Sequence, residues 1–135
     1  MQCTRKITED IIYIGASDRR ITLFENIIPL NKGVSYNSYL ILDEKTVLLD
    51  TADYAVGRQF MVNLEYGLNG RNLDYLVINH MEPDHCAMIS QVIQKYPNIK
   101  IVGNSKTFQM MKQFFEFDID QYSQVVTENE TLNTG

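Results

Sequence analysis

The sequence predicts a single α/β domain with a mixed β-sheet and helices on one face of that sheet. The chain has 135 residues, which is enough for one domain. Of these residues 44% are apolar and 21% are charged, as in an ordinary globular protein. Short apolar strand-like runs dominate the N-terminal part, and apolar residues at helical spacing alternate with such runs afterwards. This order of elements is the main argument for the fold class.

The charge balance excludes several classes of partner. The chain has 17 acidic and 12 basic residues and no run of Lys or Arg, which argues against nucleic acid and anionic membranes. No apolar run approaches the length of a membrane span, and no signal-peptide core follows Met1–Lys6. Cys3 and Cys86 are too few for a disulfide framework, and we expect Cys86 to be a small buried residue. These features predict a cytoplasmic protein.

The first elements are predicted to be strands. Apolar and β-branched residues favour strands over Arg5–Ile7, Ile11–Ile14, Tyr36–Leu42 and Thr46–Asp50. The polar segment 43–45 between the last two strands predicts a hairpin turn.

The first helix is predicted over Val56–Leu68, with Gly70 as its stop signal. Apolar residues recur there at steps of three and four and should face the core: Phe60, Met61, Leu64 and Leu68. Four polar residues should form its solvent-exposed face: Arg58, Gln59, Asn63 and Glu65.

Strands and helices alternate in the second half. A strand over Leu73–Asn79 is followed by a helix over Asp84–Lys95, a strand over Lys100–Gly103 and a helix over Ser105–Phe115. The last helix should bury four residues: Phe108, Met111, Phe114 and Phe115. A hairpin is predicted after this helix.

That hairpin comprises a strand over Tyr122–Thr127, a turn at 128–130 and a returning strand over Thr131–Gly135. The returning strand stops almost at once. We therefore expect the chain to be part of a larger domain.

Both histidines of the chain lie in one short segment with two carboxylates. His80, Glu82, Asp84 and His85 fall within six residues at the carboxyl end of a predicted buried strand, where open α/β sheets place functional groups. Side chains alternate in an extended loop, so the first three should project to one side, and His85 can turn towards them. Mixed imidazole and carboxylate donors suit iron, manganese or zinc.

Each residue of this segment also has a structural interpretation. A histidine at a strand end can be an ordinary polar residue, and Asp84 can cap the following helix. Glu82 and Asp84 can form a solvated loop, or a catalytic carboxylate pair without metal. All four residues at this spacing, including both histidines, favour the metal site.

The segment Asn79–His85 resembles the first metal-binding motif of the metallo-β-lactamase superfamily, His-x-His-x-Asp-His. Glu82 stands in place of the second histidine, and the resulting His-x-Glu-x-Asp-His is similar to the motif of flavodiiron proteins, also called A-type flavoproteins. A carboxylate is a harder donor than imidazole and favours an iron pair over zinc. The resemblance covers nearly the whole chain and includes five further segments: Ile11–Gly15, Asp18–Arg20, Phe24–Pro29, Gly33–Ile41 and Leu48–Thr51.

The resemblance implies a fold and a set of ligands. Residues 1–135 would form the N-terminal half of a metallo-β-lactamase-like αββα sandwich, without the flavodoxin-like domain. His80 and Glu82 would bind one iron and Asp84 the other, while His85 binds the second iron in some members only. Asp50 would orient one of these ligands without binding the metal itself, although it could equally be a turn residue at a strand end. The loop at residues 24–25 would face the substrate pocket.

The resemblance also implies a function. Flavodiiron proteins reduce dioxygen or nitric oxide at a di-iron centre, with electrons from FMN supplied by a donor such as rubredoxin or a reductase, as head-to-tail dimers. The chain has no histidine after His85 and no recognisable FMN site, so we expect it to be inactive alone, with an incomplete di-iron centre. A homodimer is also expected because half of a sandwich leaves an apolar sheet face uncovered. The alternatives are a zinc-dependent hydrolase of the superfamily and a non-catalytic assembly module.

Overall fold

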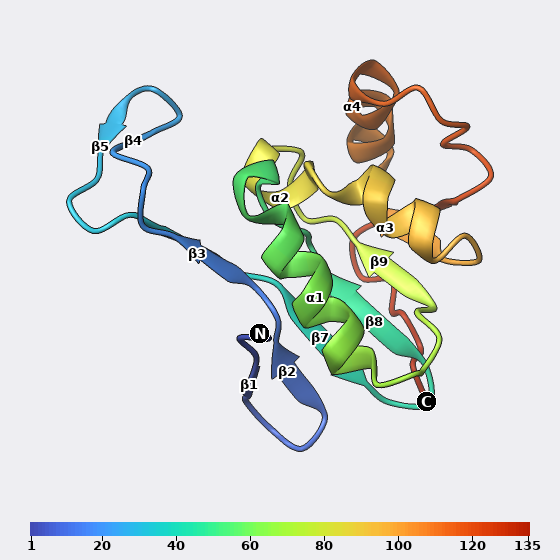
Figure 1. Ribbon diagram of the computed structural model, residues 1–135. Helices are drawn as coiled ribbons and strands as arrows, with labels where there is room; N and C mark the ends of the chain where they lie inside the picture. Colours follow the sequence, from blue (N-terminus) through green and yellow to red (C-terminus); the bar gives the residue numbers. More distant parts are fainter.

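A computed structural model describes all residues from 1 to 135 and has a seven-stranded sheet at its centre (Figure 1). The strands of this sheet lie in the order β1 (Arg5–Lys6), β2 (Ile11–Tyr13), β7 (Tyr39–Leu42), β8 (Thr46–Leu49), β9 (Tyr75–Val77), β10 (Lys100–Gly103) and β11 (Ser123–Val125). Two small ribbons pair β3 (Ala16–Asp18) with β6 (Val34–Tyr36) and β4 (Leu23–Phe24) with β5 (Ile28–Pro29). The helices are η1 (Tyr54–Val56), α1 (Gly57–Leu68), α2 (Pro83–Cys86), α3 (Ile89–Lys95) and α4 (Ser105–Phe114).

The sheet is mixed, which confirms the predicted class. Strands β1, β2, β7 and β8 pair antiparallel, whereas β8, β9, β10 and β11 pair in parallel. Each parallel connection carries a helix, as such crossovers require. The carboxyl ends of β8, β9 and β10 therefore lie at the same edge of the sheet.

The core lies between this sheet and one layer of helices. Leu40, Leu48, Leu76 and Ile101 stand opposite one another across β7, β8, β9 and β10, and all four are fully buried. They share one cluster with apolar residues of α1, α3 and α4: Phe60, Leu64, Ile89, Val92, Phe108 and Met111. Each such side chain stabilises the fold by about 1.5–3 kcal/mol. The helices thus cover one face, as predicted.

The predicted solvent face of α1 is wrong at one position. Asn63 is 0% exposed, and its Nδ2 donates to the carbonyl oxygens of Ile14 and Gly15 at 3.2 and 2.8 Å. Its Oδ1 accepts from the Cys3 backbone N–H and from Gln59 Nε2, each at 2.8 Å. A buried amide with its hydrogen bonds made is tolerated, and this one ties the helix to the N-terminal segment.

The predicted helix over 84–95 is wrong as one unit, because the chain forms α2 and α3 separately. The carbonyl oxygen of His85 accepts from both the N–H and the Oγ1 of Thr51, each at 2.8 Å. The N–H of Met88 donates to Thr51 Oγ1 at 3.3 Å. Both groups are therefore taken out of the i to i−4 ladder that would have joined the two helices.

The single strand predicted over 36–42 is also wrong, because the chain divides there into β6 and β7 around Ser38. The buried Ser38 hydroxyl donates to the carbonyl oxygen of Asp50 at 3.0 Å, which fixes the bend. The two short ribbons extend from this point as an arm away from the sheet (Figure 1). Their strands of two or three residues are too short for a detectable alternation of apolar and polar side chains.

Phe114, predicted to be buried in the last helix, is 62% exposed.

The C-terminal segment does not form the predicted returning strand at 131–135. It runs from β11 behind β9 and β8 to the β7–β8 turn (Figure 1). There the Thr134 carbonyl oxygen accepts from the Lys45 N–H at 2.7 Å, and Thr134 Oγ1 donates to Asp43 Oδ2 at 2.8 Å. These two hydrogen bonds hold the segment at one point. It lacks the series of backbone hydrogen bonds to a neighbouring strand that would make it a strand. None of the helices has the length and apolar character needed to cross a membrane.

Candidate metal centre

The candidate metal residues lie at the carboxyl edge of two neighbouring parallel strands. The loop from His80 leaves β9 and enters α2, whereas Asp50 directly follows β8. The registers of β8 and β9 are aligned, with Leu49 opposite Val77. Residues after both strands therefore meet at one edge, where α/β sheets present functional groups.

The loop brings the four predicted ligands together in two pairs. His80 Nδ1 lies 3.8 Å from Glu82 Oε2, and His85 Nε2 lies 3.4 Å from Asp84 Oδ2. The two imidazole rings connect the pairs, because their centroids are 5.0 Å apart in an edge-to-face arrangement. Asp84 lies in the first turn of α2, whose N-cap is Glu82, so the capping role considered for Asp84 is wrong.

The geometry supplies only part of a metal site. No group of three His, Cys, Asp or Glu side chains is arranged so that it could hold a metal ion. The donor types nevertheless fit iron, since each pair combines one imidazole with one carboxylate. The four residues provide two incomplete half-sites, and water or other donors would have to complete the coordination of a metal at either one.

Asp50 contacts the Nδ1 side of the His85 ring. Its carboxylate accepts from the backbone N–H of Asn79 at 2.7 Å and from Asn79 Nδ2 at 3.1 Å, and Oδ2 lies 2.9 Å from His85 Nδ1. An ionised carboxylate only accepts, so the hydrogen bond to Asp50 is donated by Nδ1 of His85, and Nε2 is the nitrogen on the side of Asp84. That is how histidine ligands are commonly oriented towards metals.

The backbone of Asp50 is strained. It has φ +54°, a left-handed conformation that costs a non-glycine residue about 1–2 kcal/mol. The residue is only 6% exposed, and the hydrogen bonds from Asn79 offset the strain. Asn79 and Thr51 were not predicted as functional residues. Their only sequence signal is that each lies directly beside a candidate residue.

A small cavity adjoins the loop. It has a volume of about 140 Å³ and is lined by Ile21, Phe24, Glu25, Tyr36, Asp53, Pro83 and Asp84. The predicted pocket loop at residues 24–25 thus reaches the same cavity as Asp84. Glu25 and Asn26 both have positive φ values, and the Ile27 N–H donates to the Phe24 carbonyl at 3.0 Å, as in a type I′ turn.

Two weak acids stay protonated, Tyr36 in the wall of this cavity and Cys86 in α2. Burial, with nearby Asp53 and Asp18, raises the pKa of Tyr36 to about 12, so its phenol stays neutral. Burial raises the pKa of Cys86 to about 11, and its Sγ donates to the Met81 carbonyl at 3.3 Å. Cys86 is a buried thiol, as predicted.

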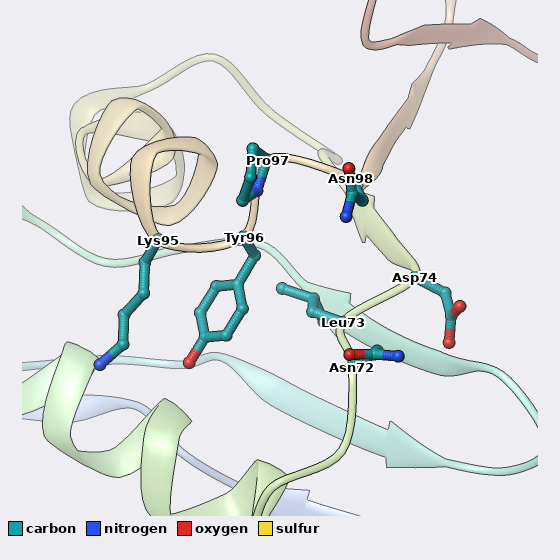
Figure 2. Close-up of a pocket in the computed structure, with 7 residues that line it drawn as sticks. All are labelled: Asn72, Leu73, Asp74, Lys95, Tyr96, Pro97 and Asn98. Atoms are coloured by element: carbon teal, nitrogen blue, oxygen red, sulfur yellow. The ribbon is translucent and has the colours of Figure 1, made fainter.

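A second cavity, of about 290 Å³, lies at the opposite edge, where β9 and β10 begin (Figure 2). It is lined by Asn72, Leu73, Asp74, Lys95, Tyr96, Pro97 and Asn98. None of the candidate metal residues reaches it.

Comparisons with known proteins show the family of the chain. The family model described as ODP family beta lactamase matches residues 34–135. The anaerobic nitric oxide reductase flavorubredoxin of Vibrio vulnificus is 39% identical over 99 residues, which cover 73% of this chain and 20% of that protein. The flavo-diiron protein FprA2 of Clostridium acetobutylicum is 28% identical over 130 residues, 96% of this chain and 32% of that protein.

A solved structure has the same fold as this chain. Rubredoxin oxygen:oxidoreductase from Desulfovibrio gigas superposes with a TM-score of 0.91 at 31% identity, covering 98% of this chain and 33% of that one. The chain thus spans between a fifth and a third of the length of these relatives. Because the family model matches well over half of its residues, the chain belongs to the ODP family of β-lactamase-like domains, the metallo-β-lactamase-like part of flavodiiron proteins.

Proposed function

We propose that the chain is part of a flavodiiron oxidoreductase that reduces dioxygen or nitric oxide. The observation that carries this proposal is the His80–Glu82 pair at 3.8 Å, in which Glu82 takes the motif position that zinc hydrolases fill with histidine. Two curated relatives support it by name, one as a nitric oxide reductase and one as a flavo-diiron protein.

His80 and Glu82 would hold one iron, and Asp84 with His85 would hold the second. The iron pair would supply the binding and reduction of the diatomic substrate, with electrons from FMN. Asp50, at 2.9 Å from Nδ1 of His85, would orient the ring so that Nε2 is the nitrogen that binds a metal. The neutral Tyr36 lines the adjoining cavity and provides a phenol that stays protonated at physiological pH.

The remaining ligands and the FMN site are proposed to lie outside these residues, in keeping with residues 1–135 being a partial metallo-β-lactamase-like domain. Iron usually takes five or six donors, and each pair here supplies two. We therefore expect the chain by itself to turn over neither substrate. Its electron donor would be rubredoxin or a reductase, acting on the whole protein.

We also propose a homodimer. The β4–β5 arm exposes apolar side chains to solvent, with Ile27 76% and Ile28 51% exposed. Apolar groups gathered at the end of a projecting arm favour burial against another chain. Light scattering at micromolar concentration should give twice the 15.6 kDa chain mass, and a monomer would contradict the proposal.

The choice of metal tests the proposed function against the zinc hydrolase. The wild-type chain and the Glu82→His variant are dialysed anaerobically against equal ferrous iron and zinc, and the bound metals are measured. Because a carboxylate is a harder donor than imidazole, the wild type should bind iron and zinc in a higher ratio than Glu82→His does. Glu128→His, which places a histidine in an exposed turn, is the control. Equal ratios in wild type and Glu82→His would contradict the proposal.

A further inference from the structure

We propose that a basic concavity between β3 and the start of α1 binds a small molecule that carries phosphate groups. It has a volume of about 700 Å³, within the range of small-molecule sites. Its walls come from the N-terminus, from the segment that begins in β3, from η1 and from α1: Met1, Ser17, Asp18, Arg19, Arg20, Ala55, Val56, Arg58, Gln59 and Val62. It shares no residue with the cavity at the metal loop.

The charges of this acidic chain are segregated towards the concavity. Three arginines line it (Arg19, Arg20 and Arg58), and Asp18 is its one acid. A neighbouring concavity shares Ser17 and Arg19 and adds Lys32. Of 17 acids and 12 bases, one acid and four bases lie here, so 16 acids and eight bases remain elsewhere. The surface is therefore locally positive on a protein of net charge −5, which attracts an anion.

One arginine is already fixed in place. Arg20 Nε donates to Asp18 Oδ1 at 3.1 Å, and Arg20 Nη2 donates to the Ala55 carbonyl oxygen at 3.3 Å. The Arg20 N–H also donates to Asp18 Oδ1, at 2.8 Å. These bonds hold the guanidinium between β3 and η1, while its Nη1 group makes no hydrogen bond. An arginine held in this way offers its Nη1 donors to a phosphate with little further loss of entropy.

The other two arginines lack partners. Arg19 and Arg58 make no ion pair and no side-chain hydrogen bond, although both line the same concavity as Arg20. Like charges gathered in one hollow repel one another, and a multiply charged anion would relieve that repulsion. Arginine also forms paired hydrogen bonds to phosphate oxygens. The one carboxylate of the concavity, Asp18, cannot pair with all three guanidinium groups.

The concavity also has an apolar side, formed by Met1, Ala55, Val56 and Val62. Met1, Ala55 and Val62 are exposed, and a purely inorganic anion would leave them in water, whereas the organic part of a nucleotide or similar ligand would cover them. An acidic protein surface would satisfy the arginines, but a hollow of this size suits a ligand that enters it. The combination favours an organic phosphate.

The test is calorimetric titration of the metal-free 135-residue chain with pyrophosphate and, separately, with ADP at low salt. We expect both to bind, ADP more tightly because it also covers the apolar side. The Arg19→Ala/Arg58→Ala variant should weaken binding of each ligand by roughly tenfold or more, since charge-assisted hydrogen bonds are lost. The control is Arg5→Ala/Lys6→Ala, which removes the same charge from the exposed edge strand β1 and should leave affinity nearly unchanged. Thermal melts confirm that both variants fold.

Several results would overturn this proposal. They are the absence of binding to both ligands, equal weakening in the control variant, or unchanged binding in Arg19→Ala/Arg58→Ala. Binding of polyglutamate without binding of pyrophosphate would also overturn it, and would assign the surface to an acidic protein partner. Because no metal is present in the titration, its outcome is independent of the proposed di-iron function.

Discussion

Oδ2 of Asp50 lies 2.9 Å from Nδ1 of His85, although the two residues are 35 positions apart in the chain. The contact exists because β8 and β9 are parallel neighbours and each ends at the same edge. It connects a strained backbone at the end of one strand to the histidine that follows the next. The orientation of His85 is therefore built into the sheet.

Substitution of Asp50 should separate stability from metal affinity. Asp50→Asn keeps a residue that tolerates positive φ and an oxygen that accepts from the Asn79 N–H, so the free energy of unfolding should fall by only about 1 kcal/mol, for the lost hydrogen bond from Asn79 Nδ2. It no longer fixes the proton on Nδ1 of His85, and ferrous iron affinity should fall roughly 10- to 100-fold. Asp50→Ala should in addition lower the free energy of unfolding by about 2–4 kcal/mol, because partners are left unsatisfied. Urea titration and anaerobic iron titration measure the two effects. Equal iron affinity in wild type and Asp50→Asn would refute this role.

The buried amide of Asn63 should be essential for stability. Asn63→Leu removes four hydrogen bonds and leaves the carbonyls of Ile14 and Gly15 and the Cys3 N–H without their partner. We expect a loss of about 2–4 kcal/mol in the free energy of unfolding, measured by urea denaturation. The exposed Asn72→Leu serves as control and should change stability by less than about 0.5 kcal/mol. A loss in Asn63→Leu as small as in the control would contradict the assignment.

Much of the fold and the position of the metal loop follow from local patterns. The periodicity of Phe60, Leu64 and Leu68 identifies α1 and its core face, and the spacing of His80, Glu82 and Asp84 identifies the loop. The errors come from contacts distant in sequence. Asn63 is buried because the N-terminal segment covers it, and the helix after residue 83 breaks because Thr51 binds its backbone. The N-terminal segment and Thr51 are distant in sequence from the helices that they contact, so local patterns could not predict these features.

The ion pair of Asp18 and Arg20 should make stability depend on pH. The neighbouring guanidinium lowers the pKa of Asp18 from its ordinary value of 3.8. The pair therefore stabilises the fold above that ordinary value, and this contribution is lost as the pH falls through the lowered pKa. The stability difference between wild type and Arg20→Gln should be constant above about pH 5 and shrink in more acidic solution. Arg19→Gln, which removes an unpaired charge, should lack this dependence. Parallel curves for Arg20→Gln and wild type from neutral to acidic pH would contradict the pair's role.

The two thiols should differ in reactivity. Cys3 is exposed, whereas Cys86 is 5% exposed and donates to the Met81 carbonyl. A maleimide reagent at pH 7 should label one site per native chain quickly and the second only after denaturation. Mass spectrometry of the digested protein assigns the label. Fast native labelling at Cys86 would show that α2 opens readily.

Iron binding by the loop from His80 to His85 underlies the proposed function. The most direct measurement is a native mass spectrum of the chain after anaerobic incubation with ferrous iron, beside those of His80→Ala and the control Asp118→Ala. We expect iron adducts in the wild type and the control that are lost or strongly reduced in His80→Ala. Adducts of equal intensity in all three proteins, or none in the wild type, would contradict it.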